Sequence, residues 1–198
     1  MLRRLHKLAI AGAFLILTVF PSWAQTNEEE RRKEIEAVKR ALQDLRICPP
    51  SQDDKPENVL SAWPDQIENL DSLRIKLSRS TCYGRCPAYT VEIRGNGEVT
   101  FVGGLFVAVP GKHMSKISPA SVNELYKAFV RVEYLSLAKQ YCAEVTDIPT
   151  YITSIEYDGR VKTVVHRGGG PAALMDLERK IDEAADTGRW LQPLQSPR

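Results

Sequence analysis

The alternation of apolar and polar residues from residue 72 onward constrains the fold more than any other feature of this sequence. Two runs, 73–78 and 89–94, place an apolar residue at every second position, which is the period of a half-buried β-strand. The second run leads into Gly95-Asn96-Gly97, and these residue types tolerate the positive φ angles of a tight hairpin turn. The pattern therefore predicts antiparallel strands, with 98–103 returning beside 89–94 and 105–111 forming a further extended segment.

A second hairpin and two helices complete the predicted domain. Asp158-Gly159 separates two further extended runs. One helix is expected at 118–132, where Ser118 can cap the first turn, and another starts at Pro171 and ends before Gly188. The expected inner faces are Val122, Leu125, Phe129 and Val132 in the first helix and Leu174, Leu177, Ile181 and Ala185 in the second.

These elements predict an α+β fold class, as a two-layer domain of residues 72–191. Its antiparallel sheet of about five or six strands is packed by two helices. An N-terminal amphipathic helix is expected at 25–48, docked either on its own domain or on a partner protein, with Ile35, Val38, Leu42 and Leu45 on one side. Residues 49–71 are expected to form a linker or covering loop in which Trp63 packs against the domain, and 192–198 a loose tail.

The first 24 residues have the pattern of a secretory signal peptide. A basic start precedes about thirteen apolar residues, too few to span a bilayer, and cleavage is expected after Ala24. An uncut membrane anchor is the alternative. Cleavage removes Arg3, Arg4 and Lys7 and no acid, so the formal charge falls from +2 to −1. We therefore expect a periplasmic or secreted protein with no membrane span after signal removal and no nucleic-acid partner.

Export favours pairing of the four cysteines, Cys48, Cys82, Cys86 and Cys142, as disulfides. Three connectivities are possible. We favour Cys82–Cys86, because Gly84 allows the short loop to bend and Pro87 fixes φ at the entry to the next strand. This leaves Cys48–Cys142 to tie the N-terminal helix to the domain. A bridge over so short a loop contributes on the order of 2 kcal/mol in the chain-entropy model.

Cys82 and Cys86 also allow a redox or metal hypothesis. Arg85 could lower a thiol pKa, although no helix is expected to begin there and the spacing is not C-x-x-C. The C-x-x-x-C-P pattern resembles copper chaperones of the Sco type, in which a distant histidine completes the site, and here His113 or His166 would be that ligand. However, that family has a helix after the second cysteine, whereas the pattern here predicts a strand.

Other motifs favour no chemistry. The "HRGGGP" segment could hold an anion at a helix N-terminus, but it lacks the Lys-Ser/Thr of a phosphate-binding loop and suits a flexible connector better. Asp147 suits a turn rather than a catalytic acid. No nucleophile elbow or acid/base pair is recognisable, so we predict no catalytic residues, no metal and no cofactor.

The segment "CYGRCPAYTVEIRGNGEVTF", together with "TDIPT" and "YDG", resembles an uncharacterised bacterial domain of unknown function, DUF6438. The resemblance covers about residues 72–190, and the C-x-G-x-C-P-x-Y core is its most specific part. It implies an exported α+β domain and no activity. The N-terminal helix, Cys48 and Cys142 lie outside the matching motif.

The sequence as a whole therefore favours a non-catalytic binding or interaction module in the cell envelope, with another envelope protein as its partner. The alternative is a thiol–disulfide redox or copper-handling protein that uses Cys82 and Cys86.

Overall fold

The computed structural model of the protein describes residues 29–33, 35–37, 40, 63–64, 67 and 69–191. The expected signal peptide, Cys48, the expected tail and most of the expected linker lie outside the described residues. The predicted N-terminal helix is helical at 29–33 and 35–37, whereas Val38, Leu42 and Leu45 are not described. No helix in the described part of the chain is both long and apolar enough to cross a membrane.

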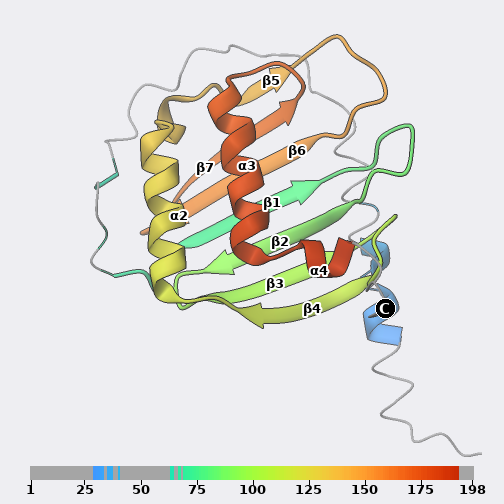
Figure 1. The fold of residues 1–198 in the computed structure, drawn as a ribbon, viewed down its shortest axis with the longest axis horizontal. Helices are drawn as coiled ribbons and strands as arrows, with labels where there is room; N and C mark the ends of the chain where they lie inside the picture. The colour runs from blue at the N-terminus through green and yellow to red at the C-terminus, as the bar shows by residue number, and fades with distance from the viewer. Residues whose placement is uncertain are drawn as a thin grey trace, which may run out of the picture.

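A seven-stranded sheet forms the centre of the domain, in the order β4-β3-β2-β1-β6-β7-β5 (Figure 1). The strands are β1 (Arg74–Arg79), β2 (Tyr89–Arg94), β3 (Glu98–Gly103), β4 (Gly111–Lys116), β5 (Gln140–Cys142), β6 (Tyr151–Tyr157) and β7 (Arg160–Arg167). Both predicted hairpins are present, with Gly97 at φ 84° and Asp158 and Gly159 at φ 51° and 72°. The predicted mixed fold is therefore confirmed in its main elements.

Two details of the predicted sheet are wrong. The sheet has seven strands rather than five or six, because β5 has only three residues and so shows no hydrophobic period. β5 also pairs with β7 in parallel, whereas the other neighbouring pairs are antiparallel.

The predicted extended segment 105–111 is also wrong, because the fourth strand begins only at Gly111. A bulge ends the β2–β3 pairing: Gly104 N donates to Ala88 O at 2.8 Å, and Ala88 N donates to Leu105 O at 2.8 Å. Phe106 then turns the chain at φ 58°. β4 itself is a polar strand at the edge of the sheet, so its sequence carries little hydrophobic alternation.

Two long helices, α2 (Pro119–Arg131) and α3 (Ala172–Ala185), cover one face of the sheet (Figure 1). The Ser118 cap is confirmed, since its side chain accepts from Ser121 N at 3.0 Å. The predicted inner faces are buried, except that Val132 is only half-buried. The structure adds a short 3-10 helix, η1 (Tyr134–Ser136), and α4 (Gly188–Leu191), which begins at the glycine expected to follow the last helix.

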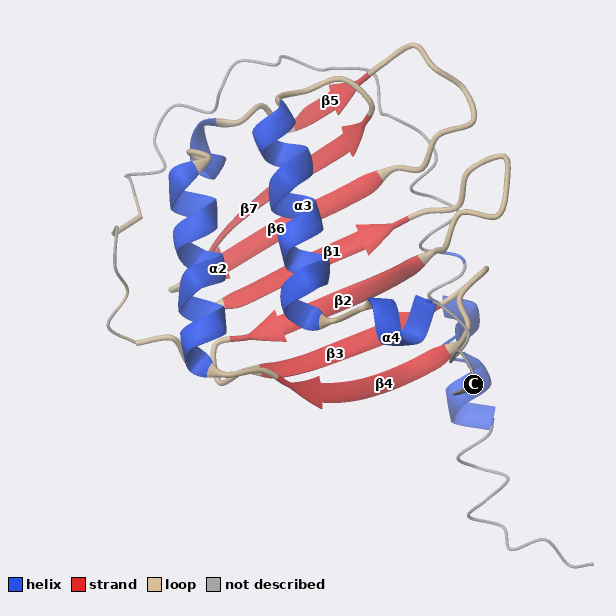
Figure 2. Cartoon of the chain, viewed as in Figure 1, coloured by secondary structure: helices blue, strands red, loops and turns tan. Residues whose placement is uncertain are grey.

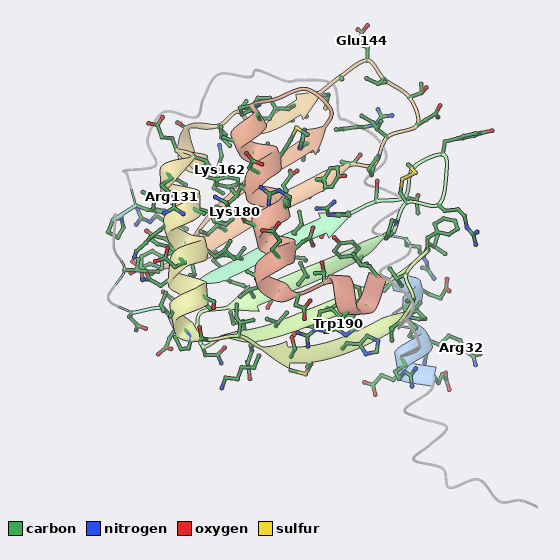
Figure 3. All side chains as sticks on the ribbon, viewed as in Figure 1. Arg32, Arg131, Glu144, Lys162, Lys180 and Trp190 are labelled. Atoms are coloured by element: carbon green, nitrogen blue, oxygen red, sulfur yellow. A yellow bond between two sulfur atoms is a disulfide. The ribbon has the colours of Figure 1, made fainter. Side chains whose placement is uncertain are left out.

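The core between helices and sheet is closed by aromatic side chains from the flanking segments. Trp63 is 6% exposed and stacks on Tyr126 with ring centroids 6.4 Å apart, so it packs against the domain as predicted. At the opposite end, Trp190 of α4 stacks on Phe101 of β3 at 4.7 Å (Figure 3). These two contacts fix the segments that enter and leave the sandwich.

Candidate functional site

Four connections meet at one end of the sheet (Figure 2). They join β1 to β2 (80–88), β3 to β4 (104–110), β5 to β6 (143–150) and β7 to α3 (168–171). The cysteine segment, Asp147 and the run of three glycines are thus brought to the same end of the molecule, although they lie far apart in the sequence. This loop end, defined by these four connections, is the candidate functional site.

The β1–β2 loop is hydrogen-bonded to a neighbouring loop on each side. Ser80 N donates to Thr150 O at 2.9 Å, and Thr150 N donates to Ser80 Oγ at 2.8 Å. On the other side, the bulge described above joins Ala88 to the β3–β4 loop. The first and last residues of the loop are therefore fixed in position by backbone hydrogen bonds.

Inside this loop, Cys82 and Cys86 form a disulfide with their Cα atoms 5.5 Å apart. Gly84 N donates to Cys82 Sγ at 3.2 Å, which closes the turn between the two cysteines. Cys142 is disulfide-bonded as well. Because Cys48 lies outside the described residues, the Cys48–Cys142 pairing stays a prediction.

Gly84 does not need the conformational freedom that the sequence suggested. It is not among the glycines with positive φ, and an added Cβ would lie 3.7 Å from Cys82 Sγ, an ordinary contact distance. We therefore expect Gly84→Ala to form the disulfide and to change the free energy of unfolding by no more than about 0.5 kcal/mol. Urea unfolding and mass-spectrometric mapping of the bridge test this. A loss of the bridge would show that the turn needs glycine.

A single carboxylate from α3 holds both ends of the β1–β2 loop. Arg79, the last residue of β1, forms an ion pair with Asp182, and Tyr89, the first residue of β2, donates from its hydroxyl to Asp182 Oδ1 at 2.7 Å. Arg79 and Tyr89 are also directly paired in the sheet. Thr187 Oγ1 donates to the same Oδ1 at 3.0 Å, and the Arg79 guanidinium lies 4.4 Å from the ring centroid of Tyr151. We call this set, Arg79, Tyr89, Asp182 and Thr187, the Asp182 clamp.

Burial governs the pKa values within the Asp182 clamp. It raises the pKa of Asp182, and the Arg79 charge opposes this shift. Burial and the Asp182 charge together raise the pKa of Tyr89 far above its ordinary value. Burial alone would lower the pKa of Arg79, but attraction to Asp182 and the nearby tyrosines outweighs it and raises that pKa. Arg79 and Tyr89 are therefore hydrogen-bond donors at neutral pH, which suits a structural role better than proton transfer.

His166 and Glu178 form a second contact between α3 and the sheet, one helical turn before Asp182. His166 Nδ1 lies 3.0 and 3.1 Å from the two carboxylate oxygens of Glu178, and its Nε2 lies 2.9 Å from Gly169 O. Because both ring nitrogens face acceptors, the doubly protonated ring satisfies both contacts. The hydrogen bond to Glu178 raises the pKa of His166.

This shift predicts a pH dependence of stability. A histidine whose pKa is raised by folding stabilises the fold below its ordinary pKa of 6.5, and this contribution is lost as the pH rises through the raised value. We expect the difference in unfolding free energy between wild type and His166→Gln to shrink from pH 5.5 to pH 9. Urea unfolding across this range measures it. A difference that stays constant with pH would contradict a charged His166.

The two histidines named as alternative copper ligands lie on different strands, His113 on β4 and His166 on β7. His166 is already engaged on both nitrogens, and Cys82 and Cys86 are bonded to each other. No cluster of three or more His, Cys, Asp or Glu side chains suited to a metal occurs among the described residues. The residues after Cys82 form no helix, so they also lack a helix dipole that would activate a thiol.

A family model described as a domain of unknown function, DUF6438, matches residues 73–185. The chain belongs to the DUF6438 family. The matched region begins one residue before β1 and ends with the last residue of α3. It thus includes all seven strands of the DUF6438 domain, the disulfide loop and three of the four clamp residues, whereas Thr187 and α4 follow it. No curated protein matches the chain.

Sequence reasoning missed the residues through which α3 holds the loop end of this DUF6438 domain. Arg79 and Asp182 are 103 positions apart, so nothing local connects them. A signal was nevertheless present. Arg79 lies at the next inward-facing position of β1 after Ile75 and Leu77. Glu178 is a charged residue among the buried apolar residues of α3. Charged residues at inward positions are uncommon unless they are paired.

Proposed function

We propose that this protein is an exported, non-catalytic binding domain that contacts another protein of the cell envelope through its loop end. Export is inferred from the signal-peptide pattern of residues 1–24 and agrees with the use of cysteines as disulfides. We infer binding rather than catalysis because the ionisable side chains of the Asp182 clamp and the His166–Glu178 contact, which lie beneath the loop end, already bind one another.

The single observation that carries this proposal is Tyr83. Its side chain is 88% exposed at the tip of the disulfide-closed turn. A side chain this exposed buries little apolar area in its own fold, whereas tyrosines are enriched among the residues that dominate binding interfaces. The disulfide and the Asp182 clamp hold the loop in one conformation, which lowers the entropy lost when a partner binds.

Neighbouring loops add apolar surface to the same end of the molecule. Phe106 in the β3–β4 loop is 47% exposed and has a φ of 58°. A bulky residue rarely adopts this left-handed conformation, and such strain concentrates at functional positions. Val145 in the β5–β6 loop is 49% exposed, next to Glu144, which points away from the domain (Figure 3). A partner that covers Tyr83 can therefore bury further apolar area on either side.

Site-specific crosslinking in the living cell tests the proposal. A photoreactive phenylalanine analogue is placed at Tyr83 or Phe106, and a matched control at Val161, which is 54% exposed on β7, away from these loops. We expect a discrete adduct with one envelope protein from the first two positions and none from the third. An equal pattern from all three positions, or no adduct from Tyr83, would contradict a binding surface here.

Disulfide removal separates binding from folding in the same assay. The variant Cys82→Ser/Cys86→Ser keeps Tyr83 but removes the closure of its turn. We expect the Tyr83 adduct to weaken strongly while the far-ultraviolet circular dichroism stays unchanged. Fractionation of the cells, together with a free-thiol count on protein purified without reductant, tests export and oxidation directly. Free thiols at both positions with stoichiometric copper would overturn the proposal.

A further inference from the structure

β4 forms one edge of the sheet in the described part of the chain, and its outer side is a surface distinct from the loop end. Ile117 N donates to Gly97 O at 2.9 Å, so Gly97 and Ile117 are a hydrogen-bonded pair of the β3–β4 ladder. Such pairs alternate along an antiparallel ladder. With the observed register, the backbone groups of Ser115, His113 and Gly111 point toward β3. Those of Lys112, Met114 and Lys116 therefore point outward.

These three outward residues meet no further strand within the described part of the chain, where β4 is the last strand of the sheet (Figure 1). Their side chains all project from the face that α2 and α3 leave uncovered. Lys112 and Lys116 are exposed, and Met114 between them is 64% exposed. The edge thus offers the backbone N–H and C=O groups of three residues to a further strand. Their side chains form a row in which Met114 lies between Lys112 and Lys116.

Charge determines what can pair with this edge. Two copies of β4 meeting in antiparallel fashion with Met114 on the twofold axis would place Lys112 of each copy opposite Lys116 of the other. Like charges directly opposite each other destabilise a strand pair, so the lysines disfavour self-association. Within the sheet only Glu98 faces this row, opposite Lys116, so positive charge remains in excess. The same row attracts a strand with acids at the two flanking positions.

We propose that β4 binds an extended segment of a partner protein by antiparallel strand addition, and that this segment carries an acidic, an apolar and a second acidic residue at alternate positions. Main-chain hydrogen bonds to Lys112, Met114 and Lys116 hold the added strand. The acids face the two lysines, and the apolar residue covers Met114. This surface is separate from Tyr83, so either binding role can fail without the other.

A charge-swap experiment with synthetic peptides tests the proposal on the full chain. The acidic probe is Thr-Glu-Thr-Val-Thr-Glu-Thr, and its matched control is Thr-Lys-Thr-Val-Thr-Lys-Thr. We expect wild type to bind the acidic peptide, and Lys112→Glu/Lys116→Glu to lose at least about tenfold in affinity for it, because two attractive cross-strand pairs become repulsive. The double variant is expected to bind the basic peptide instead. Binding is measured by fluorescence anisotropy at low salt.

Backbone pairing is tested by amide hydrogen exchange and by proline. The acidic peptide is expected to slow exchange at Lys112, Met114 and Lys116 and to leave Tyr83 unaffected. Met114→Pro removes an outward N–H without removing a bond to β3, and it should abolish binding. No binding at millimolar peptide, equal affinity for both peptides, or unchanged exchange at these three amides would overturn the proposal. These outcomes say nothing of Tyr83, whose test is crosslinking.

Discussion

Replacing Asp182 with alanine is expected to lower the free energy of unfolding by about 3 kcal/mol. The change leaves the Arg79 guanidinium, whose side chain is only 22% exposed, without its ion-pair partner. It also removes the acceptor for the buried Tyr89 hydroxyl. Breaking a buried ion pair from one side costs about 3–5 kcal/mol, and the partial exposure of Arg79 places this case at the lower end. Urea unfolding measures the loss.

Two further variants separate charge from hydrogen bonding at this position. Asp182→Asn keeps an oxygen that can accept from Tyr89 and Thr187 but removes the charge that faces Arg79, so an intermediate loss is expected. Glu183→Ala changes the neighbouring residue, which is exposed and forms an ion pair with the exposed Arg179, so it should change little. If Asp182→Ala costs no more than Glu183→Ala, the clamp does not contribute to stability.

The same variant tests whether the clamp orders the Tyr83 loop. Arg79 and Tyr89 flank residues 80–88, and the Asp182 carboxylate of α3 contacts both of them. We expect faster amide hydrogen exchange in this loop in Asp182→Ala, even where the disulfide remains intact. Unchanged exchange there would mean that the disulfide and the Ser80–Thr150 hydrogen bonds are sufficient to order it.

The parts of the fold that could be predicted are those whose signals are local. Gly97, Asp158 and Gly159 have positive φ angles, which these residue types tolerate, so each turn is visible in the sequence. The two helices show apolar stripes because each lies against one face of the sheet. β4 and β5 gave no such signal, since an edge strand does not need alternating burial and three residues cannot show a period.

The candidate site depended instead on contacts between distant segments. The Cys82–Cys86 pairing could be proposed because its two residues are four positions apart. Asp182 could not be placed, because Arg79 and Tyr89 lie 103 and 93 positions away from it. Glu178 and His166 are only 12 positions apart, but they lie in different elements, and no local pattern shows that the strand and the helix meet there. His113 and His166 could be named as alternative third ligands from residue type alone, but the sequence could not show that His166 contacts Glu178 and Gly169.

Replacing Trp190 with alanine is expected to cost about 3–5 kcal/mol, the usual loss for a buried tryptophan. The side chain is 7% exposed, and its ring stacks on Phe101 at 4.7 Å. In addition, Trp190 O accepts from Val109 N at 3.1 Å, which holds the β3–β4 loop that contains Phe106. Urea unfolding, with Trp190→Phe to keep an aromatic ring and Arg189→Ala as the exposed neighbour, measures the effect.

The Trp190–Phe101 contact also indicates that the folded unit extends beyond residue 185. The family match ends at residue 185, but α4 lies beyond it and fills the space beside β3 (Figure 3). If α4 is part of the fold, a chain ending at residue 185 should unfold at lower urea than wild type by at least as much as Trp190→Ala. The shortened chain should also expose the Phe101 ring, because the Trp190 ring stacks on it at 4.7 Å. If Trp190→Ala is as stable as Arg189→Ala, the Trp190 side chain does not contribute to the stability of the fold.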